Sequence, residues 1–264
     1  MIKAVIFDLQ EIKLSKDCDF LKNAKLAGLK LACVAQDESP LKARPNPELY
    51  QQAFLGLGAG CDETVIISDS LLSQRTARNA KCLSIGLGAS DNELSFILKG
   101  ADLFLDSLDS FPTFSTAKEF DAVLNKEVKA FYDRTIIGKL MKTAIQVREN
   151  AYAPYSNFKV GAGLLTETGK VYAGCNVENA SLGATICAER GASMAAIATE
   201  GKKQFQMIAV ASSAEDPAPP CAICRQFLSE FMPPDGQVFM ISVTSGVIKH
   251  YSFEALLPCT FTEF

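Results

Sequence analysis

The sequence predicts an α/β protein with two domains. Within residues 1–87, short apolar runs alternate with helix-like segments, which is the periodicity of a doubly wound domain built on a parallel sheet. Polar and turn-forming residues interrupt this rhythm at 106–124, and strand-like and helix-like segments then resume. We therefore expect a first domain at 1–112, a linker at 113–125 and a second domain at 126–264, a division that 264 residues readily accommodate.

The first domain is expected to begin with a buried strand. Residues 2–8 form an apolar run that ends in Asp8, as a buried parallel strand would present a carboxylate at its C-terminal edge. The proline-rich segment 44–49 is expected to start a helix that continues to 57 or 58. Further strands are expected at 29–35, 65–70 and 82–87, and further helices at 18–27 and 72–80.

The second domain is expected to combine a mixed sheet with flanking helices. Apolar residues at helical spacing predict one amphipathic helix over 127–149. Strands at 160–165 and 171–175 form a predicted hairpin around the turn residues 166–169. The segments 207–211, 221–232 and 238–243 are expected to form a parallel β-α-β unit, which would place the loop before 221 at the carboxyl end of a strand.

Two short motifs carry most of the chemical information. Cys187-Ala188-Glu189-Arg190 is followed about thirty residues later by Pro220-Cys221-Ala222-Ile223-Cys224-Arg225. Three thiolates can fill three positions of a tetrahedral zinc ion and leave the fourth to water. Both motifs open predicted helices, where the helix dipole favours the thiolate form. A structural zinc site or buried thiols are the alternatives, but the C-x-E element favours a catalytic site of the zinc deaminase type.

Residues 126–264 resemble the small, three-cysteine, homotetrameric cytidine deaminases. The resemblance rests on both cysteine motifs, on segments 155–162 and 174–181, and on 256–258 followed by Phe261. It implies zinc-dependent hydrolysis of cytidine or deoxycytidine to uridine or deoxyuridine and ammonia, in pyrimidine salvage. It also implies a tetramer in which Phe261 reaches the pocket of a neighbouring subunit. The implied substrate contacts are Asn176, Glu178, Phe158, Ala188 and Phe261.

The expected roles follow from side-chain chemistry. Zinc on Cys187, Cys221 and Cys224 would lower the pKa of water toward about 7. Glu189 would accept the proton of that water, deliver it to the ring nitrogen and then supply a proton to departing ammonia. Arg190 is expected to offset the negative charge of three thiolates. Asn176 and Glu178, two positions apart on an extended segment, would point the same way and suit two ribose hydroxyls.

Residues 1 to about 110 resemble the haloacid dehalogenase-like superfamily, particularly its β-phosphoglucomutase-like branch without a cap. Asp8 matches the nucleophile of that family, but the second acid of the motif is replaced by Gln10, which has no proton to give. Arg44 stands for the family lysine, the acidic pair is reduced to Ser68-Asp69, and the Ser/Thr position falls near Gln36. We therefore expect the first domain to be a catalytically inactive scaffold. The alternatives are that it retains phosphatase activity or that Asp8 and Asp69 hold a magnesium ion.

Composition and charge limit the classes of molecule that this protein is expected to bind. The net charge of −4, the pI near 5.2 and the lack of a dense basic run argue against nucleic acid and membrane surfaces, and favour a small-molecule substrate. Nine cysteines without a disulfide-like framework, and no recognisable signal peptide or membrane-length apolar run, favour a cytoplasmic protein. A deaminase of another small aminopyrimidine compound remains an alternative.

Overall fold

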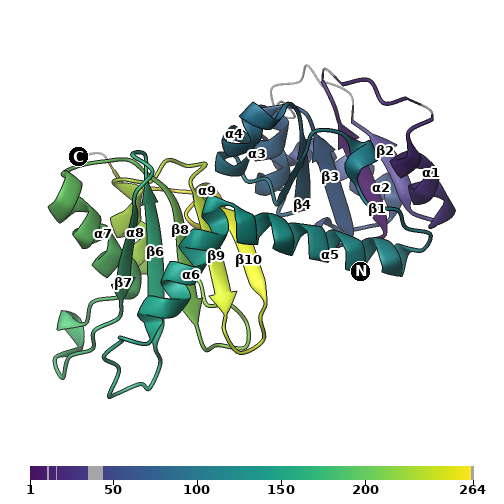
Figure 1. Cartoon of the computed structure of the whole chain (residues 1–264). Helices are drawn as coiled ribbons and strands as arrows, with labels where there is room; N and C mark the ends of the chain where they lie inside the picture. The colour runs from purple at the N-terminus through teal and green to yellow at the C-terminus, as the bar shows by residue number, and fades with distance from the viewer. Residues whose placement is uncertain (11, 16, 35–43, 263–264) are drawn as a thin grey trace. The chain divides into compact units, whose positions relative to one another are not determined.

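The computed structural model describes residues 1–10, 12–15, 17–34 and 44–262. The chain divides into two compact units, Met1–Arg134 and Thr135–Phe264 (Figure 1). Each unit has its own five-stranded sheet covered by helices, so the predicted α/β class is confirmed.

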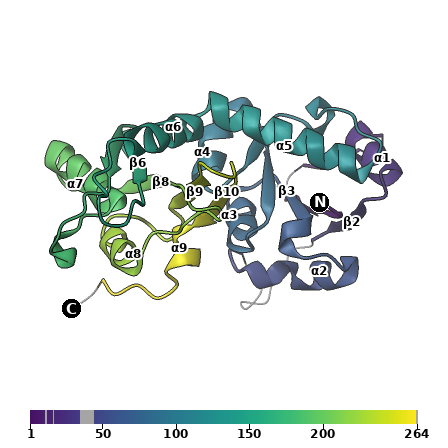
Figure 2. The same ribbon diagram turned by 90° about the horizontal axis from the view of Figure 1, so that it is seen from below.

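The first unit is doubly wound around an all-parallel sheet of order β2-β1-β3-β4-β5. The helices α1 and α5 lie on one face, where Phe7 of the sheet contacts Phe20, and α2 and α3 lie on the other (Figure 2). Strand β1 is buried along its length and pairs Asp8 with Ser68 of β3, which brings both to the carboxyl edge of the sheet. The strands are β1 (Ala4–Asp8), β2 (Lys30–Cys33), β3 (Thr64–Ser68), β4 (Leu83–Leu87) and β5 (Leu103–Leu105).

The helices of this unit follow the sequence prediction until the end of β4. A 3₁₀ turn at Pro47–Tyr50 leads into α2, in agreement with the expected proline start. The short elements α4 and β5 were not predicted, because six- and three-residue segments are too brief to show a period. The helices are α1 (Asp19–Leu26), α2 (Gln51–Leu57), α3 (Leu71–Asn79), α4 (Glu93–Leu98) and α5 (Ala117–Arg134).

The stretch expected as a linker belongs instead to the core of the first unit. Phe111, Phe114 and Phe120 are buried and form an aromatic cluster with Phe20, with ring centroids 4.7 to 6.0 Å apart. Helix α5 begins at Ala117, inside the expected linker. Burial of several phenylalanines outweighs the turn-forming residues between them.

The expected single helix over 127–149 is divided at Thr135. Its φ of −105° and ψ of 178° are extended, so α5 ends at Arg134 and α6 begins at Ile136. Tyr132 fixes the end of α5 to the first unit by donating a hydrogen bond of 2.6 Å to the buried Asp102. Asp102 also pairs with Arg78 of α3, so the last turn of α5 is tied to the first unit.

The second unit has a mixed sheet of order β10-β9-β8-β6-β7. Strands β8 and β9 are parallel and connected through α8, so the predicted β-α-β unit is confirmed, as is the β6-β7 hairpin. Helix α6 covers one face of the sheet, and α7 and α8 cover the other (Figure 2). The elements are α6 (Ile136–Arg148), β6 (Val160–Thr166), β7 (Val171–Cys175), α7 (Ala188–Glu200), β8 (Phe205–Ser212), α8 (Ala222–Ser229), β9 (Gln237–Ser242), β10 (Ile248–Ser252) and α9 (Phe253–Leu256).

Glycines allow the helices to approach this sheet closely. A Cβ at Gly161 would lie 2.0 Å from the carbonyl oxygen of Ala144 in α6, and a Cβ at Gly174 would lie 2.1 Å from the amide nitrogen of Ala192 in α7. Both distances are far below van der Waals contact, so any larger residue would push a helix away from the sheet. Within the described residues, no helix is both long and apolar enough to cross a bilayer.

Candidate metal centre and adjoining cavity

Three sulfur atoms converge at the starts of two helices. The Sγ atoms of Cys187, Cys221 and Cys224 all lie within 4.8 Å of one another, and those of Cys187 and Cys221 are 3.9 Å apart. Cys187 is the N-cap of α7 and Cys221 is the N-cap of α8, as the sequence predicted. Tetrahedral zinc with sulfur at about 2.3 Å keeps its sulfurs about 3.8 Å apart, so the spacing and the donor set fit zinc.

The neighbours of Cys187 favour its thiolate form. The pKa of Cys187 is lowered to about 5 because the thiol of Cys224 and the guanidinium of Arg190 stabilise its thiolate, whereas the pKa of buried Cys224 is raised by the same neighbour. Arg190 reaches the sulfur of Cys187 at 3.8 Å and donates to the carbonyl oxygen of Thr185 at 2.9 Å. Arg190 therefore lies within reach of the Cys187 sulfur.

Glu189 lies in the first turn of α7, two residues after Cys187. Its side chain is only 4% exposed. Burial, with a smaller contribution from the charge of Cys187, raises the pKa of Glu189 to about 7. A carboxyl group with this pKa can both accept and return a proton near neutral pH. Neighbouring Ala188 is fully buried at the same helix start.

An extended segment brings a second pair of polar side chains to the start of α7. Residues 176–178 run between Tyr152 and Ile186, with Val177 exchanging backbone hydrogen bonds of 2.9 and 3.0 Å with Ile186. The Asn176 amide donates to the Phe158 carbonyl oxygen and accepts from the Val160 amide, each at 2.8 Å. This cross-linking holds the loop that contains Phe158, whose own ring is partly exposed.

Glu178 reaches the same loop from the same side of the extended segment. Its carboxylate accepts hydrogen bonds from the amides of Tyr155 at 2.9 Å and Ser156 at 3.2 Å, and from the Ser156 hydroxyl. The Ser156 hydroxyl is the largest cause of a lowered pKa for Glu178, which keeps the carboxylate ionised. Asn176 and Glu178 therefore turn toward one loop, in agreement with the alternation of an extended segment.

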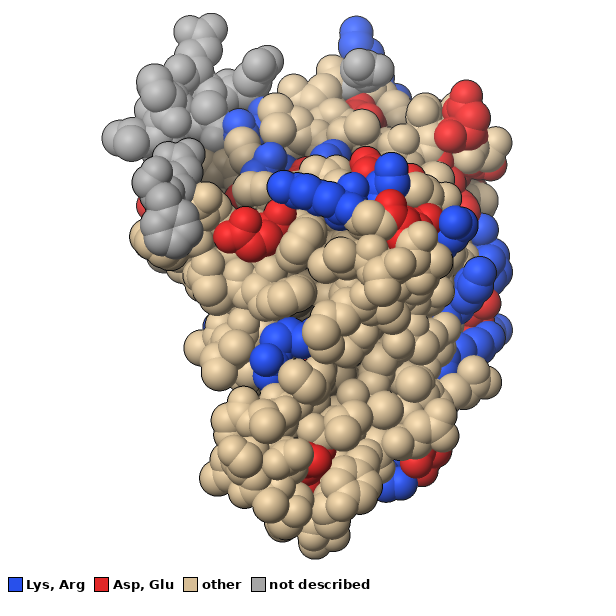
Figure 3. All heavy atoms as spheres, turned by 90° about the vertical axis from the view of Figure 1, so that its left-hand side faces the viewer, with Lys and Arg blue, Asp and Glu red and all other residues tan. Residues whose placement is uncertain are grey.

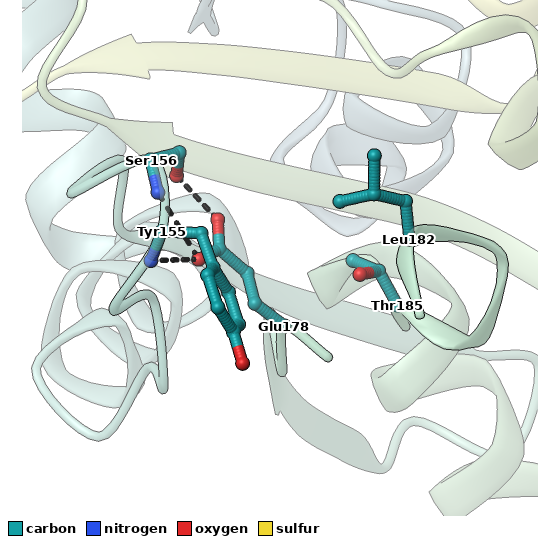
Figure 4. Close-up of a pocket in the computed structure, with 5 residues that line it drawn as sticks. All are labelled: Tyr155, Ser156, Glu178, Leu182 and Thr185. Atoms are coloured by element: carbon teal, nitrogen blue, oxygen red, sulfur yellow. Dashed lines mark hydrogen bonds between the residues drawn. The ribbon is translucent and has the colours of Figure 1, made fainter. Parts of the chain in front are cut away.

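A cavity of about 360 Å³ opens beside Glu178. Figure 4 shows Glu178 turned toward Tyr155 and Ser156, with Leu182 and Thr185 across from them. Thr185 connects the cavity lining to the cysteine cluster. It precedes Cys187 by two residues, and its carbonyl oxygen accepts a hydrogen bond from Arg190. The sequence did not single out Thr185 or Ser156 as site residues. The one indication for Ser156 was that it belongs to the same motif as Phe158.

Phe261, the remaining predicted contact, lies at the C-terminal end of the described chain. Its side chain is 62% exposed, and its carbonyl oxygen accepts a hydrogen bond of 2.6 Å from Gln226 of α8. The structure does not bring the Phe261 ring to the cavity lining within one chain.

The first unit offers a second candidate at Asp8, but its carboxylate is already engaged. Arg44 forms an ion pair with it through Nη2 and also donates from Nε at 3.1 Å. The Tyr50 hydroxyl donates at 2.7 Å and the Gln10 amide at 3.1 Å. Asp8 is fully buried, so its oxygens face these four donors rather than an open site.

Asp69 is engaged in a similar way. Its two carboxylate oxygens accept from the backbone amides of Gln10 and Ile12, each at 2.7 Å. The carboxylate therefore holds the loop after β1. Gln36, the position expected for the missing hydroxyl residue, lies outside the described residues.

Comparisons with known proteins match the part of the chain that contains the three cysteines. Residues 135–240 match the family described as the cytidine and deoxycytidylate deaminase zinc-binding region. A cytidine deaminase of Halalkalibacterium halodurans is 46% identical over 123 residues, which cover 47% of this chain and 92% of that protein. The crystal structure of cytidine deaminase from Burkholderia pseudomallei has 44% identity and a TM-score of 0.44, covering 47% of this chain and 98% of that one. A putative β-phosphoglucomutase from Bacteroides vulgatus covers 42% of this chain and 53% of its own, with 18% identity and a TM-score of 0.33.

Proposed function

Because the chain belongs to the cytidine deaminase family, we propose that its second unit hydrolyses cytidine or deoxycytidine to uridine or deoxyuridine and ammonia. The observation that carries the proposal is the convergence of three cysteine sulfurs with a buried carboxyl group at one helix start. A place in pyrimidine salvage follows from the reaction, since it returns a free nucleoside to the uridine pool.

Cys187, Cys221 and Cys224 would hold zinc. When bound with an open fourth position, zinc acts as a Lewis acid and lowers the pKa of water. Arg190, beside Cys187, would reduce the negative charge of the thiolates. The helix start at Cys187 favours the thiolate of this residue in the same way.

Glu189 would carry the protons. It would accept one proton from the attacking water and pass it to the ring nitrogen next to the reacting carbon. It would then take the second proton of the same water from the newly attached oxygen and supply it to the amino group, which leaves as ammonia. The raised pKa suits this cycle, because neither protonation state is strongly favoured near neutral pH.

The cavity beside Glu178 would take the sugar. An ionised carboxylate fixed by three donors keeps a defined orientation toward a hydroxyl group. Asn176 retains one N–H and one lone pair beyond its two backbone hydrogen bonds, which leaves capacity for a second hydroxyl group. Phe158 and Ala188 would contact the base. An aminopyrimidine compound without a sugar would leave the remaining hydrogen-bonding capacity of Asn176 and Glu178 unused, which favours a nucleoside.

We infer a cytoplasmic homotetramer. Figure 3 views the side of the second unit that carries α7, and its lower part shows few charged side chains. Exposed apolar residues of this unit include Tyr152, Val177, Leu182, Ile223 and Phe261. Uncharged, apolar surface of this kind is typical of subunit contacts, and Phe261 would close the pocket of a neighbour. Free thiols as metal ligands suit a reducing compartment.

The first unit is proposed to lack phosphatase activity. Asp8 would need a free oxygen to attack phosphorus, and four donors occupy its carboxylate. Gln10 cannot protonate a leaving group.

The direct test is the loss of ultraviolet absorbance of cytidine with the full-length chain. Glu189→Gln should keep its zinc and lose about 10²–10⁴-fold in turnover. Cys221→Ala should lose both zinc and stability. Glu230→Gln, an exposed glutamate after α8, is the matched control and should behave as wild type. Near-normal turnover of Glu189→Gln would refute the assignment, and faster turnover of cytosine than of cytidine would favour the alternative substrate class.

A further inference from the structure

The two residues that follow Cys224 link the metal-binding helix to the C-terminal segment, residues 256–261. Arg225 and Gln226 both lie on α8 and both donate to backbone carbonyl oxygens of that segment. Neither has a part in the proposed proton transfer, and neither lines the cavity.

Arg225 joins two pieces of backbone through one rigid group. Its Nε donates at 2.8 Å to the carbonyl oxygen of Pro220, the residue before Cys221, and its Nη1 donates at 2.9 Å to the carbonyl oxygen of Leu256 at the end of α9. The guanidinium is planar, so it fixes the separation of these two carbonyl groups. Lysine offers a single nitrogen on a flexible chain and cannot reproduce this geometry.

Gln226 holds the far end of the segment. Its amide nitrogen donates at 2.6 Å to the carbonyl oxygen of Phe261 and at 3.3 Å to the hydroxyl of Ser229. The Ser229 hydroxyl in turn donates to the carbonyl oxygen of Gln226 at 2.7 Å, which fixes the side chain on α8. Residues 259–261 are exposed, so side-chain burial contributes little to holding them.

We propose that Arg225 and Gln226 are positioning residues that couple the C-terminal segment to the cysteine loop. Arg225 restrains the loop that presents Cys221, and Gln226 restrains the backbone that presents Phe261. The effect on cytidine binding rests on the proposed function, because it requires Phe261 to close a nucleoside pocket. The restraint of the C-terminal segment does not depend on the proposed function.

Hydrogen exchange of the full-length protein, followed by mass spectrometry, tests the restraint without any assay of activity. Gln226→Met should speed exchange in residues 254–262 by about two- to tenfold, the range expected for loss of one hydrogen bond, and leave 221–229 unchanged. Arg225→Lys should speed exchange in both segments. The matched controls are Arg134→Lys and Gln52→Met, both on helices of the first unit, and they should leave exchange in both segments unchanged.

Two further measurements connect the restraint to the site. Arg225→Lys should lose zinc to a chelator about two- to tenfold faster than wild type, whereas Gln226→Met should lose it at the wild-type rate. Gln226→Met should raise KM for cytidine with kcat unchanged. Unchanged exchange at 254–262 in both variants would overturn the coupling whatever the activity. Faster exchange with wild-type zinc loss and wild-type KM would overturn its link to the site. Failure of wild type to deaminate cytidine would refute the proposed function alone.

Discussion

Replacing Gly174 with alanine tests whether close packing of α7 on the sheet sets the geometry of the candidate site. A Cβ at this position would lie 2.1 Å from the amide nitrogen of Ala192, 2.5 Å from the carbonyl oxygen of Ala188 and 2.7 Å from the carbonyl carbon of Gly191. All three are backbone atoms of α7, so no side chain can rotate away. The helix that carries Glu189 must move instead.

The size of the movement follows from these distances. Ordinary van der Waals contact begins at 3.4 Å, so the Ala192 nitrogen would have to retreat by about 1.3 Å. Forcing extra volume into a packed core costs about 1–3 kcal/mol, and rigid backbone on both sides places this change at the upper end. A misplacement of about 1 Å in a catalytic group can cost about 100-fold in rate. We therefore expect a loss of about 3 kcal/mol in stability and of about 100-fold in kcat/KM.

Gly183→Ala provides the control, because nothing lies within 4 Å of a Cβ at Gly183 and its φ is not positive. It should change the stability by less than about 0.5 kcal/mol. Stability is measured by urea unfolding, with hydrogen exchange of β7 and α7 to assign the change to the second unit, since two units can unfold separately. Wild-type stability and wild-type kcat/KM in Gly174→Ala would refute the reasoning.

Three further predictions concern other parts of the molecule. Asp8→Asn should destabilise the first unit by about 3–5 kcal/mol in urea unfolding, because it leaves the buried Arg44 without its ion pair. Cytidine turnover should not change. Magnesium-dependent hydrolysis of a sugar phosphate that Asp8→Asn abolishes would contradict the inactive scaffold. Lys170, with Thr168 and Thr166, lowers the pKa of Glu200 from 4.5 to about 2, so the stabilisation from Glu200 should be complete above pH 4.5 and decline as pH falls toward 2. A stability difference between wild type and Glu200→Gln that stays constant from pH 6 to pH 3 would contradict this. Truncation after Pro258 should raise KM for cytidine and loosen the oligomer in light scattering; a fully active monomer would show that each chain closes its own site.

The cluster of three cysteines could be predicted from sequence because most of its geometry is local. Cys221 and Cys224 are three positions apart at one helix start, so a single turn of α8 brings both sulfurs to the same point. Cys187 is placed equally simply at the start of α7, which ends at Glu200 and is followed by Gly201 with a φ of 71°, as the sequence indicated. Only the approach of the two helix starts to each other depends on tertiary structure. It could be predicted because the two cysteine motifs occur together in the family that the sequence resembles.

The surroundings of the site could not be predicted in the same way, because they depend on contacts between distant residues. The donors to Glu178 lie 22 and 23 positions before it, and their backbone amides carry no signal in the sequence. The network on Asp8 similarly joins Arg44 and Tyr50, which are 36 and 42 positions away. The resemblance matched Arg44 to a lysine position, but only the fold shows that its guanidinium pairs with the carboxylate of Asp8.

The division between the units shows how local and long-range signals can conflict. Pro112 and its serine and threonine neighbours correctly indicate irregular backbone before α5, but irregular backbone need not be a linker. Phe111 and Phe114 in the same stretch are buried against Phe20, and Tyr132 bonds to Asp102 from the last turn of α5. A fragment ending at residue 112 would lose Phe114 and the whole of α5, exposing the remaining aromatic rings to water at about 25 cal/mol for each Å². A fragment ending at Arg134 keeps the cluster intact, so Thr135, where the backbone leaves the helix, is the boundary at which we expect the first unit to be separable.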